Sequence, residues 1–114
     1  MMVTIEADDK YTQLVRFDIA RDKQSALIAA IVGQVDTWVC RLPGFISSTL
    51  HASLDGEHVI NYAQWKDEAS FHGFLHDPRN QQLQSAIHAV DAGAKPHAIH
   101  CRVVRGIEAP SPGQ

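Results

Sequence analysis

An Asp-Gly pair, Asp55-Gly56, lies between two runs rich in β-branched and aromatic residues, and it constrains the fold of this chain more than any other feature. Asp-Gly is the strongest short hairpin signal, because the tightest hairpin turns need positive φ angles that glycine adopts without strain. Residues 45–54 before the pair and residues 57–65 after it are therefore predicted to form two paired antiparallel strands.

A strand and a long helix are predicted before this hairpin. Residues 11–19 alternate between an apolar face and a mixed face, which indicates a first strand. Residues 23–40 place Leu27 and Ile31 at helical spacing, and Asp22 is the expected N-cap. The chain thus begins with a strand followed by a helix.

A second helix, in two pieces, is predicted after the hairpin. The first piece starts in an acidic turn and is expected to bury Phe71, Phe74 and Leu75. Asp77 then caps the second piece, which has a proline at its first helical position. The inner face of the second piece carries Leu83, Ile87 and Val90.

A last alternating strand over residues 97–105 completes the order β-α-β-β-α-β. That order is typical of the ferredoxin-like α+β fold, an antiparallel sheet with its helices on one face. The predicted domain spans residues 11–105, between an N-terminal extension at residues 1–10 and a C-terminal tail at residues 106–114.

Apolar residues fall on both faces of the predicted sheet. They are Val15, Phe17, Ile60, Tyr62, Cys101 and Val103. The helices cover only one face, so a second copy of the chain is expected to cover the other, which predicts a homodimer. Tyr62 and Gln64 are expected to point toward that partner.

Composition excludes several classes of protein. The chain has 114 residues, of which 45% are hydrophobic and 20% charged, and a formal net charge of -3 with scattered basic residues. Nucleic acid is therefore not an expected partner, and no apolar run is long enough for a membrane span. Cys40 and Cys101 form no metal-spaced motif and are expected to be small buried residues. Without a secretory signal, a reduced cytoplasmic protein is expected.

Histidines suggest a metal site only weakly. His72 and His76 have the i, i+4 spacing that places two imidazoles on one helical face. The H-E-x-x-H pattern is missing and Gly73 loosens this helix, so no metal is expected. His97 and His100 fall on opposite faces of a strand and do not chelate one ion together.

Asn61, Ala63 and Trp65 share one face of the third predicted strand. Small Ala63 leaves room between an amide and an indole, both of which donate hydrogen bonds. Neutral donors in a water-poor pocket hold a phenolate or enolate oxygen at low reorganisation cost. An electron-rich phenolate can pass an electron to O2, so such a pocket has to supply deprotonation, positioning and dry surroundings.

Four blocks of sequence together resemble the antibiotic biosynthesis monooxygenase family. They are Pro43-Gly44-Phe45, His51-Ala52-Ser53, Asp55-Gly56 and the Asn-Tyr-Ala-Gln-Trp run at residues 61–65. The resemblance covers residues 11–105 and implies a dimeric α+β barrel with a small-molecule cavity between sheet and helices. It also implies a cofactor-independent monooxygenase that oxidises a phenolic, hydroquinone or anthrone-type aromatic substrate to a quinone, with O2 as co-substrate. Asn61 and Trp65 would then be catalytic, binding the substrate oxygen and steering the oxygen adduct.

Four further residues are expected to contact the substrate, namely His51, Phe71, Gln84 and Trp38. His51 lies in a matched block and is either a general base or a hydrogen-bonded sheet histidine. Phe71 and Gln84 stand where a similar member of the family has a tyrosine and an arginine, so a proton donor and a cation are missing. Arg79 is either a substitute cation or a solvated surface residue, and Trp38 is either core or pocket wall.

Two alternative functions stay open. The first is a non-catalytic barrel that binds aromatic ligands, which the residues at Phe71 and Gln84 favour. The second is a haem-degrading monooxygenase of the same fold, to which Trp65 and His76 invite comparison. Residues 11–19 contain no asparagine where that group places one, so haem is the weaker alternative.

Overall fold

The structure of the chain is a computed structural model that describes residues 10–110. Its strands are β1 (Tyr11–Asp18), β2 (Phe45–Ala52), β3 (His58–Trp65) and β4 (Pro96–Cys101). Its α-helices are α1 (Gln24–Thr37), α2 (Glu68–His76) and α3 (Asn80–Val90), with short 3-10 turns η1 (Arg21–Lys23) and η2 (Val39–Arg41). The predicted N-terminal extension, except Lys10, lies outside the described residues, as do residues 111–114 of the predicted tail.

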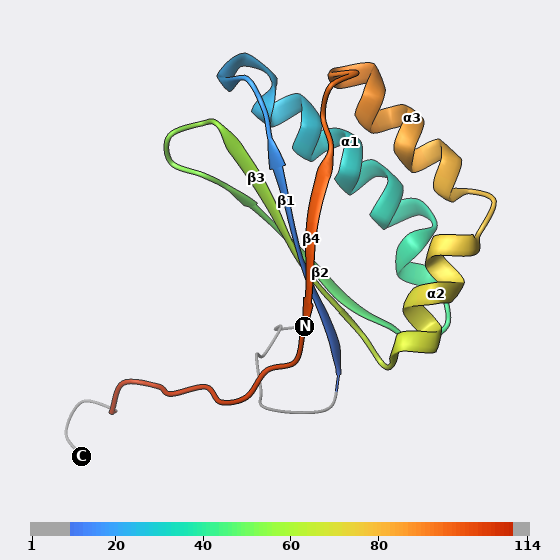
Figure 1. Ribbon diagram of the computed structural model, residues 1–114, viewed down its shortest axis with the longest axis vertical. Coiled ribbons are helices and arrows are strands. Elements are labelled where there is room, and N and C mark those ends of the chain that lie inside the picture. Colours follow the sequence, from blue (N-terminus) through green and yellow to red (C-terminus); the bar gives the residue numbers. More distant parts are fainter. Residues whose placement is uncertain (1–9, 111–114) are drawn as a thin grey trace.

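The strands form one sheet in the order β2-β3-β1-β4, and each neighbouring pair is antiparallel. The helices lie together on one face of this sheet (Figure 1). The predicted ferredoxin-like α+β fold is therefore confirmed, and the second helix is divided between α2 and α3 as predicted. Among residues 10–110, no helix is long and apolar enough to cross a membrane.

The Asp-Gly turn sets the register of β2 and β3. Gly56 has a φ angle of 80°, and His51 pairs with Ile60 in the register that a tight turn at this point dictates. A bulge between Phe45 and Ser47 then shifts the pairing near the start of β2. Both strands stop short of their predicted ends at the turn, because side chains there replace ladder hydrogen bonds.

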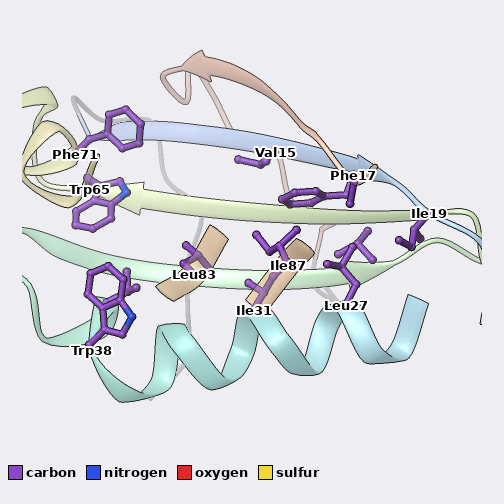
Figure 2. Packing of buried hydrophobic residues seen from close by; sticks show 13 residues of the cluster. Val15, Phe17, Ile19, Leu27, Ile31, Trp38, Trp65, Phe71, Leu83 and Ile87 are labelled. Atoms are coloured by element: carbon purple, nitrogen blue, oxygen red, sulfur yellow. The ribbon is translucent and has the colours of Figure 1, made fainter. Parts of the chain in front are cut away.

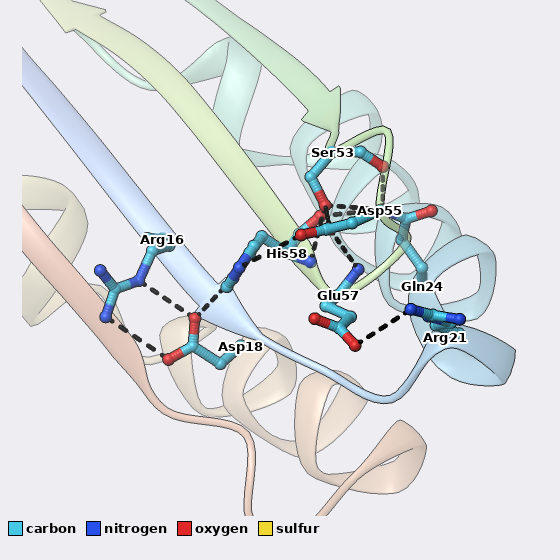
Figure 3. Close-up of polar contacts among 8 residues, drawn as sticks. All are labelled: Arg16, Asp18, Arg21, Gln24, Ser53, Asp55, Glu57 and His58. Carbon is cyan, nitrogen blue, oxygen red and sulfur yellow. Dashed lines mark hydrogen bonds and ion pairs between the residues drawn. The ribbon is translucent and has the colours of Figure 1, made fainter.

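Polar side chains fasten this turn to the start of α1 (Figure 3). Gln24 Nε2 donates to the carbonyl oxygens of Ser53 and His58, at 3.1 and 2.9 Å. Ser53 Oγ donates to Asp55 Oδ1 at 2.6 Å, and His58 Nδ1 lies 2.7 Å from Asp18 Oδ1. The hydrogen bond from His58 lowers the pKa of Asp18. The hairpin end is thereby tied to β1 and α1.

The start of α1 differs from the prediction. Asp22 is not the N-cap, because it lies inside η1, and α1 begins at Gln24 after Lys23 with no side-chain cap. The backbone N–H of Lys23 donates to the carbonyl of Ala20 at 2.9 Å, so the chain enters the helix through a tighter turn.

The helical stripes that the sequence predicts form the core between helices and sheet (Figure 2). Leu27 and Ile31 of α1 and Leu83 and Ile87 of α3 are all buried. The strand residues that meet them include Val15, Phe17 and Val59. The prediction for Leu75 is wrong, because its position near the end of α2 leaves it 46% exposed.

Two predictions for the cysteines and the last strand are also wrong. Cys40, in η2, and Cys101, at the end of β4, are both exposed free thiols. β4 ends at Cys101 and not at residue 105, and Val103 is therefore outside the sheet. The cause is the length of β1, since Cys101 pairs with Thr12 and β1 has a single residue beyond that point.

Candidate active site

A cavity of about 290 Å³ lies between the sheet and the helices. Residues from each of the four strands and the three α-helices line it, and most of them are apolar. Its polar lining includes Gln13, Ser48, Asn61, Gln84 and His100. A mainly apolar cavity with a few polar groups is the usual form of a small-molecule site.

Asn61 lines the cavity from the middle of β3, on the same face as Ala63 and Trp65. Ser48, on the neighbouring strand β2, donates its hydroxyl proton to Asn61 Oδ1 at 2.7 Å. This hydrogen bond fixes the amide so that Nδ2 remains available as a donor, since no residue in the described chain accepts from it. Donors fixed in this way bind an anionic oxygen without reorganising.

Trp65 ends β3 and is 2% exposed. Its ring packs edge-on against Phe45 at 5.4 Å between centroids and stacks on Phe74 at 5.4 Å. The indole Nε1 is buried and has no hydrogen-bond partner within residues 10–110. An unpaired buried N–H costs about 1 to 3 kcal/mol, so its presence in the cavity wall calls for an acceptor from outside the chain.

Phe71 and Gln84 also line the cavity. Phe71, on α2, is buried and stacks on Tyr11 at 5.2 Å between ring centroids. Gln84, on α3, is exposed and donates from Nε2 to Asn80 Oδ1 at 3.1 Å. Four of the six predicted site residues, Asn61 and Trp65 included, therefore meet in one cavity.

His51 and Trp38 do not line this cavity. His51 pairs with Ile60, so its side chain lies on the face of the sheet opposite Asn61, with Nδ1 3.3 Å from the Ile60 carbonyl oxygen. Trp38 is buried behind Phe74, 5.9 Å away between centroids, and its Nε1 donates to the Gln34 side chain at 2.7 Å.

Arg79 is held away from the cavity by its own neighbours. Its guanidinium bonds both carboxylate oxygens of Asp77, at 3.0 and 2.9 Å, and lies 5.0 Å from the centre of the Trp38 ring. These hydrogen bonds lower the pKa of Asp77 from 3.8 to about 2. Arg79 is therefore bound to Asp77 at the start of α3 and is not the cation of the cavity.

The histidines that suggested a metal or haem site from the sequence, His72 and His76, lie outside the cavity lining. His76 Nδ1 lies 2.8 Å from the carbonyl oxygen of His72. Within the described part of the chain, potential metal ligands gather at the hairpin end, where Asp55, Glu57 and His58 approach within 4.8 Å. These groups are already engaged, Asp55 by the Glu57 N–H, Glu57 by Arg21 and His58 by Asp18.

Ser48 and His100 are among the cavity residues that the sequence analysis did not identify. Ser48 faces Asn61 because the Asp-Gly turn sets their strands in register, a signal that the sequence carries. His100 lies on β4 opposite Gln13, on the same strand face as Ala98, and alternation alone places it beside Ala98. Which face of β4 meets the cavity depends on a pairing between the two ends of the chain.

Fold and cavity together define a ferredoxin-like α+β domain with an internal cavity of a size that suits a small molecule. Residues 10–86 match the family described as Antibiotic biosynthesis monooxygenase, and the chain belongs to that family. The predicted family and enzyme class, a monooxygenase, are confirmed.

The chain is similar along its length to characterised relatives. It is 38% identical over 112 residues to a tetracenomycin-F1 monooxygenase from Streptomyces glaucescens, covering 97% of each chain. The monooxygenase of Streptomyces coelicolor from the gene ActVA-Orf6, solved with the ligand nanaomycin D, matches with a TM-score of 0.78 and 34% identity. That match covers 90% of this chain and 93% of the other. SnoaB of Streptomyces nogalater, described as a cofactor-independent oxygenase, shares the fold at a TM-score of 0.63 and 20% identity over 94% and 100% of the two chains.

Proposed function

We propose that this chain is a cofactor-independent monooxygenase that oxidises a phenolic or anthrone-type polycyclic aromatic to a quinone, with O2 as its co-substrate. The observation that carries the proposal is the buried, unpaired Trp65 Nε1 on the same face of β3 as the Asn61 amide, in a mainly apolar cavity. The similarity to a tetracenomycin-F1 monooxygenase supports the substrate class.

The cavity residues supply what such a reaction needs from a protein. Trp65 Nε1 and Asn61 Nδ2 donate hydrogen bonds to oxygen atoms of the substrate anion, and this lowers the free energy of the charge as it forms. Phe71 and Phe74 cover the ring system and exclude water, so that the anion stays electron-rich. Positioning in a dry cavity then replaces the chemistry that a bound metal or flavin would bring.

The reaction balances with O2 alone. A substrate methylene loses a proton, and the carbanion transfers one electron to O2 to give a carbon radical and superoxide. The two combine to a peroxide, which eliminates water and leaves a carbonyl. Overall, one CH2 group and one O2 become one C=O group and one H2O, with one oxygen atom kept by the product.

The test is oxygen uptake by metal-free protein with a panel of anthrone, naphthol and hydroquinone substrates. Removing one preorganised donor typically lowers kcat about 10² to 10³-fold, so Asn61→Ala and Trp65→Phe are each expected to fall by that amount. Uptake that neither substitution changes contradicts this site. Tight binding of the aromatics with no uptake contradicts the enzyme and leaves the aromatic-binding barrel.

We also propose that the chain is a homodimer in which the sheet face away from the helices is covered by the partner. On that face Ile99 is 65% exposed, and Leu14 and Ile60 are half-buried. Gln64 on the same face is buried and donates to Thr12 Oγ1 at 3.2 Å. A cytoplasmic location is supported by the free thiols of both cysteines.

A further inference from the structure

We propose that His100 is the base that takes the proton from the substrate in this cavity. The inference rests on the proposed function, because an oxygenation that uses no cofactor begins only once the aromatic has become an anion. The donors Asn61 and Trp65 stabilise that anion but have no basic atom with which to make it. A proton acceptor within the cavity is therefore required.

His100 is the single imidazole in the described cavity lining. The other polar lining groups are amides, a hydroxyl and an indole, which neither gain nor lose a proton near neutral pH. Phe71 and Gln84 likewise provide no basic atom. Histidine is the ordinary choice for a general base at physiological pH.

The fold directs the imidazole into the cavity. His100 pairs with Gln13 of β1, and both side chains lie on the helix-facing side of the sheet with Ala98. Its ring lies 5.3 Å from the Tyr11 ring and 5.2 Å from the Phe71 ring, between centroids. No hydrogen bond within the described residues occupies either ring nitrogen of His100. The imidazole is thus held by aromatic contacts while its nitrogens stay open to a ligand.

His100 and Trp65 lie against the same ring. The Phe71 centroid is 5.2 Å from that of His100 and 6.3 Å from that of Trp65. A fused-ring substrate packed over Phe71 therefore reaches the indole donor with one edge and the imidazole with another. His100 is also exposed at the cavity margin.

The other titratable groups around this end of the cavity do not compete for the proton. Tyr11 on β1 stays protonated, because burial and, secondarily, the Glu68 charge raise its pKa. On α2, His72 Nε2 lies 3.3 Å from Glu68 Oε1, and both are solvent-exposed outside the cavity lining. On β4 itself, His97 points to the opposite face, 4.0 Å from Asp18. None of these groups lines the cavity.

The proton balance closes over one turnover. The substrate C–H or O–H bond breaks, its electron pair stays on the substrate, and an imidazole nitrogen gains the proton. After O2 has added, the imidazolium returns a proton to the outer oxygen of the peroxide. The remaining C–H bond of that carbon then breaks, its electron pair forms the C=O bond as the O–O bond breaks, and the departing hydroxide leaves as water with the released proton. The imidazole is neutral again at the end, so no further reactant is needed.

The experiment compares His100→Gln with His97→Gln, an exposed histidine on the same strand that faces away from the cavity. His100→Gln is expected to lower kcat for oxygen uptake about 10² to 10³-fold with KM within about threefold, and to remove the loss of activity at acid pH. His97→Gln is expected to change kcat less than about twofold. Free imidazole is expected to restore activity to His100→Ala. Wild-type kcat in His100→Gln, or an equal loss in His97→Gln, overturns the inference.

A second readout separates this inference from the proposed function. A fluorescent naphthol that the protein does not oxidise reports ionisation directly through its naphtholate emission. Wild-type protein is expected to raise the naphtholate fraction at neutral pH, and His100→Gln is expected to abolish that rise while naphthol still binds. If no panel substrate leads to oxygen uptake but the rise in naphtholate fraction depends on His100, the proposed function is contradicted and the role of His100 as a base is retained. If wild type and His100→Gln consume oxygen equally, the role of His100 as a base is contradicted and the proposed function is retained.

Discussion

The two tryptophans of the chain differ in one respect that predicts opposite effects of the same substitution. Both are buried, Trp65 at 2% and Trp38 at 5% exposed. Trp38 Nε1 donates to the Gln34 side chain at 2.7 Å, whereas Trp65 Nε1 has no partner within the described chain. Replacing each with phenylalanine removes the same atoms, and only one of the two variants breaks a hydrogen bond.

The expected free energies follow from that difference. At roughly 24 cal/mol per Å³ of residual cavity, losing about 40 Å³ of the indole costs each variant about 1 kcal/mol. Trp65→Phe also removes an unpaired N–H that costs the wild type about 1 to 3 kcal/mol. The free energy of unfolding of this variant is therefore expected to be no more than about 1 kcal/mol below that of wild type, or to exceed it. Trp38→Phe loses a hydrogen bond worth about 1 kcal/mol on top of the packing, and its free energy of unfolding is expected to fall by about 2 kcal/mol.

Urea unfolding followed by far-UV circular dichroism measures both variants without relying on tryptophan emission, and equal m-values confirm that midpoints report stability. Oxygen uptake on the same preparations is expected to be lost in Trp65→Phe at unchanged stability. A destabilisation of Trp65→Phe equal to that of Trp38→Phe refutes the reasoning, because it means that the folded protein satisfies the Trp65 N–H. A stable Trp65→Phe that keeps full activity refutes the role of this N–H as a donor to substrate.

Three further outcomes are expected. The folded-state pKa of Asp77 is about 2, below its ordinary value of 3.8. Its carboxylate therefore stabilises the protein above pH 4, and this stabilisation is lost as the pH falls toward 2. Asp77→Asn is expected to lower the melting temperature at pH 6, and the difference from wild type is expected to disappear in acid. Gly44→Ala is expected to lower the free energy of unfolding, measured by chemical unfolding, by at least about 1 to 3 kcal/mol, because φ is 80° and the new Cβ overlaps Ser70. Gly33→Ala, whose new Cβ points into open space on α1, is expected to raise it by about 1 kcal/mol. Ile99→Asp is expected to halve the mass in sedimentation equilibrium, and a wild-type protein that sediments as a monomer contradicts the proposed dimer.

Much of the fold can be predicted from the sequence because its signals are local. The Asp-Gly turn, the stripe of Leu27 and Ile31, and the break at Asp77 each act within a few residues, and each is present in the structure. The exposure of Cys40 and Cys101 could not be read locally, because an apolar residue at the end of an element is buried only if another element reaches it.

The candidate site divides along the same line. Asn61 and Trp65 share a strand face, so alternation suffices to place them together. The register that the Asp-Gly turn sets also pairs His51 with Ile60. This pairing, which can be predicted from the sequence, places His51 outside the cavity. His100 was missed because its place depends on β4 pairing with β1, which no local turn determines.

That pairing of the last strand with the first has a consequence for how the protein matures. β1 makes its ladders with β3 and β4, both of which follow it at long range in the chain, and β4 closes the cavity with Pro96, Ala98 and His100. Contacts between distant segments form late, since the intervening chain must first be ordered. A nascent or truncated chain that ends before β4 therefore has the indole and amide donors but no closed cavity around them. The protein can therefore hold a substrate only after the last strand has been synthesised and has paired with the first.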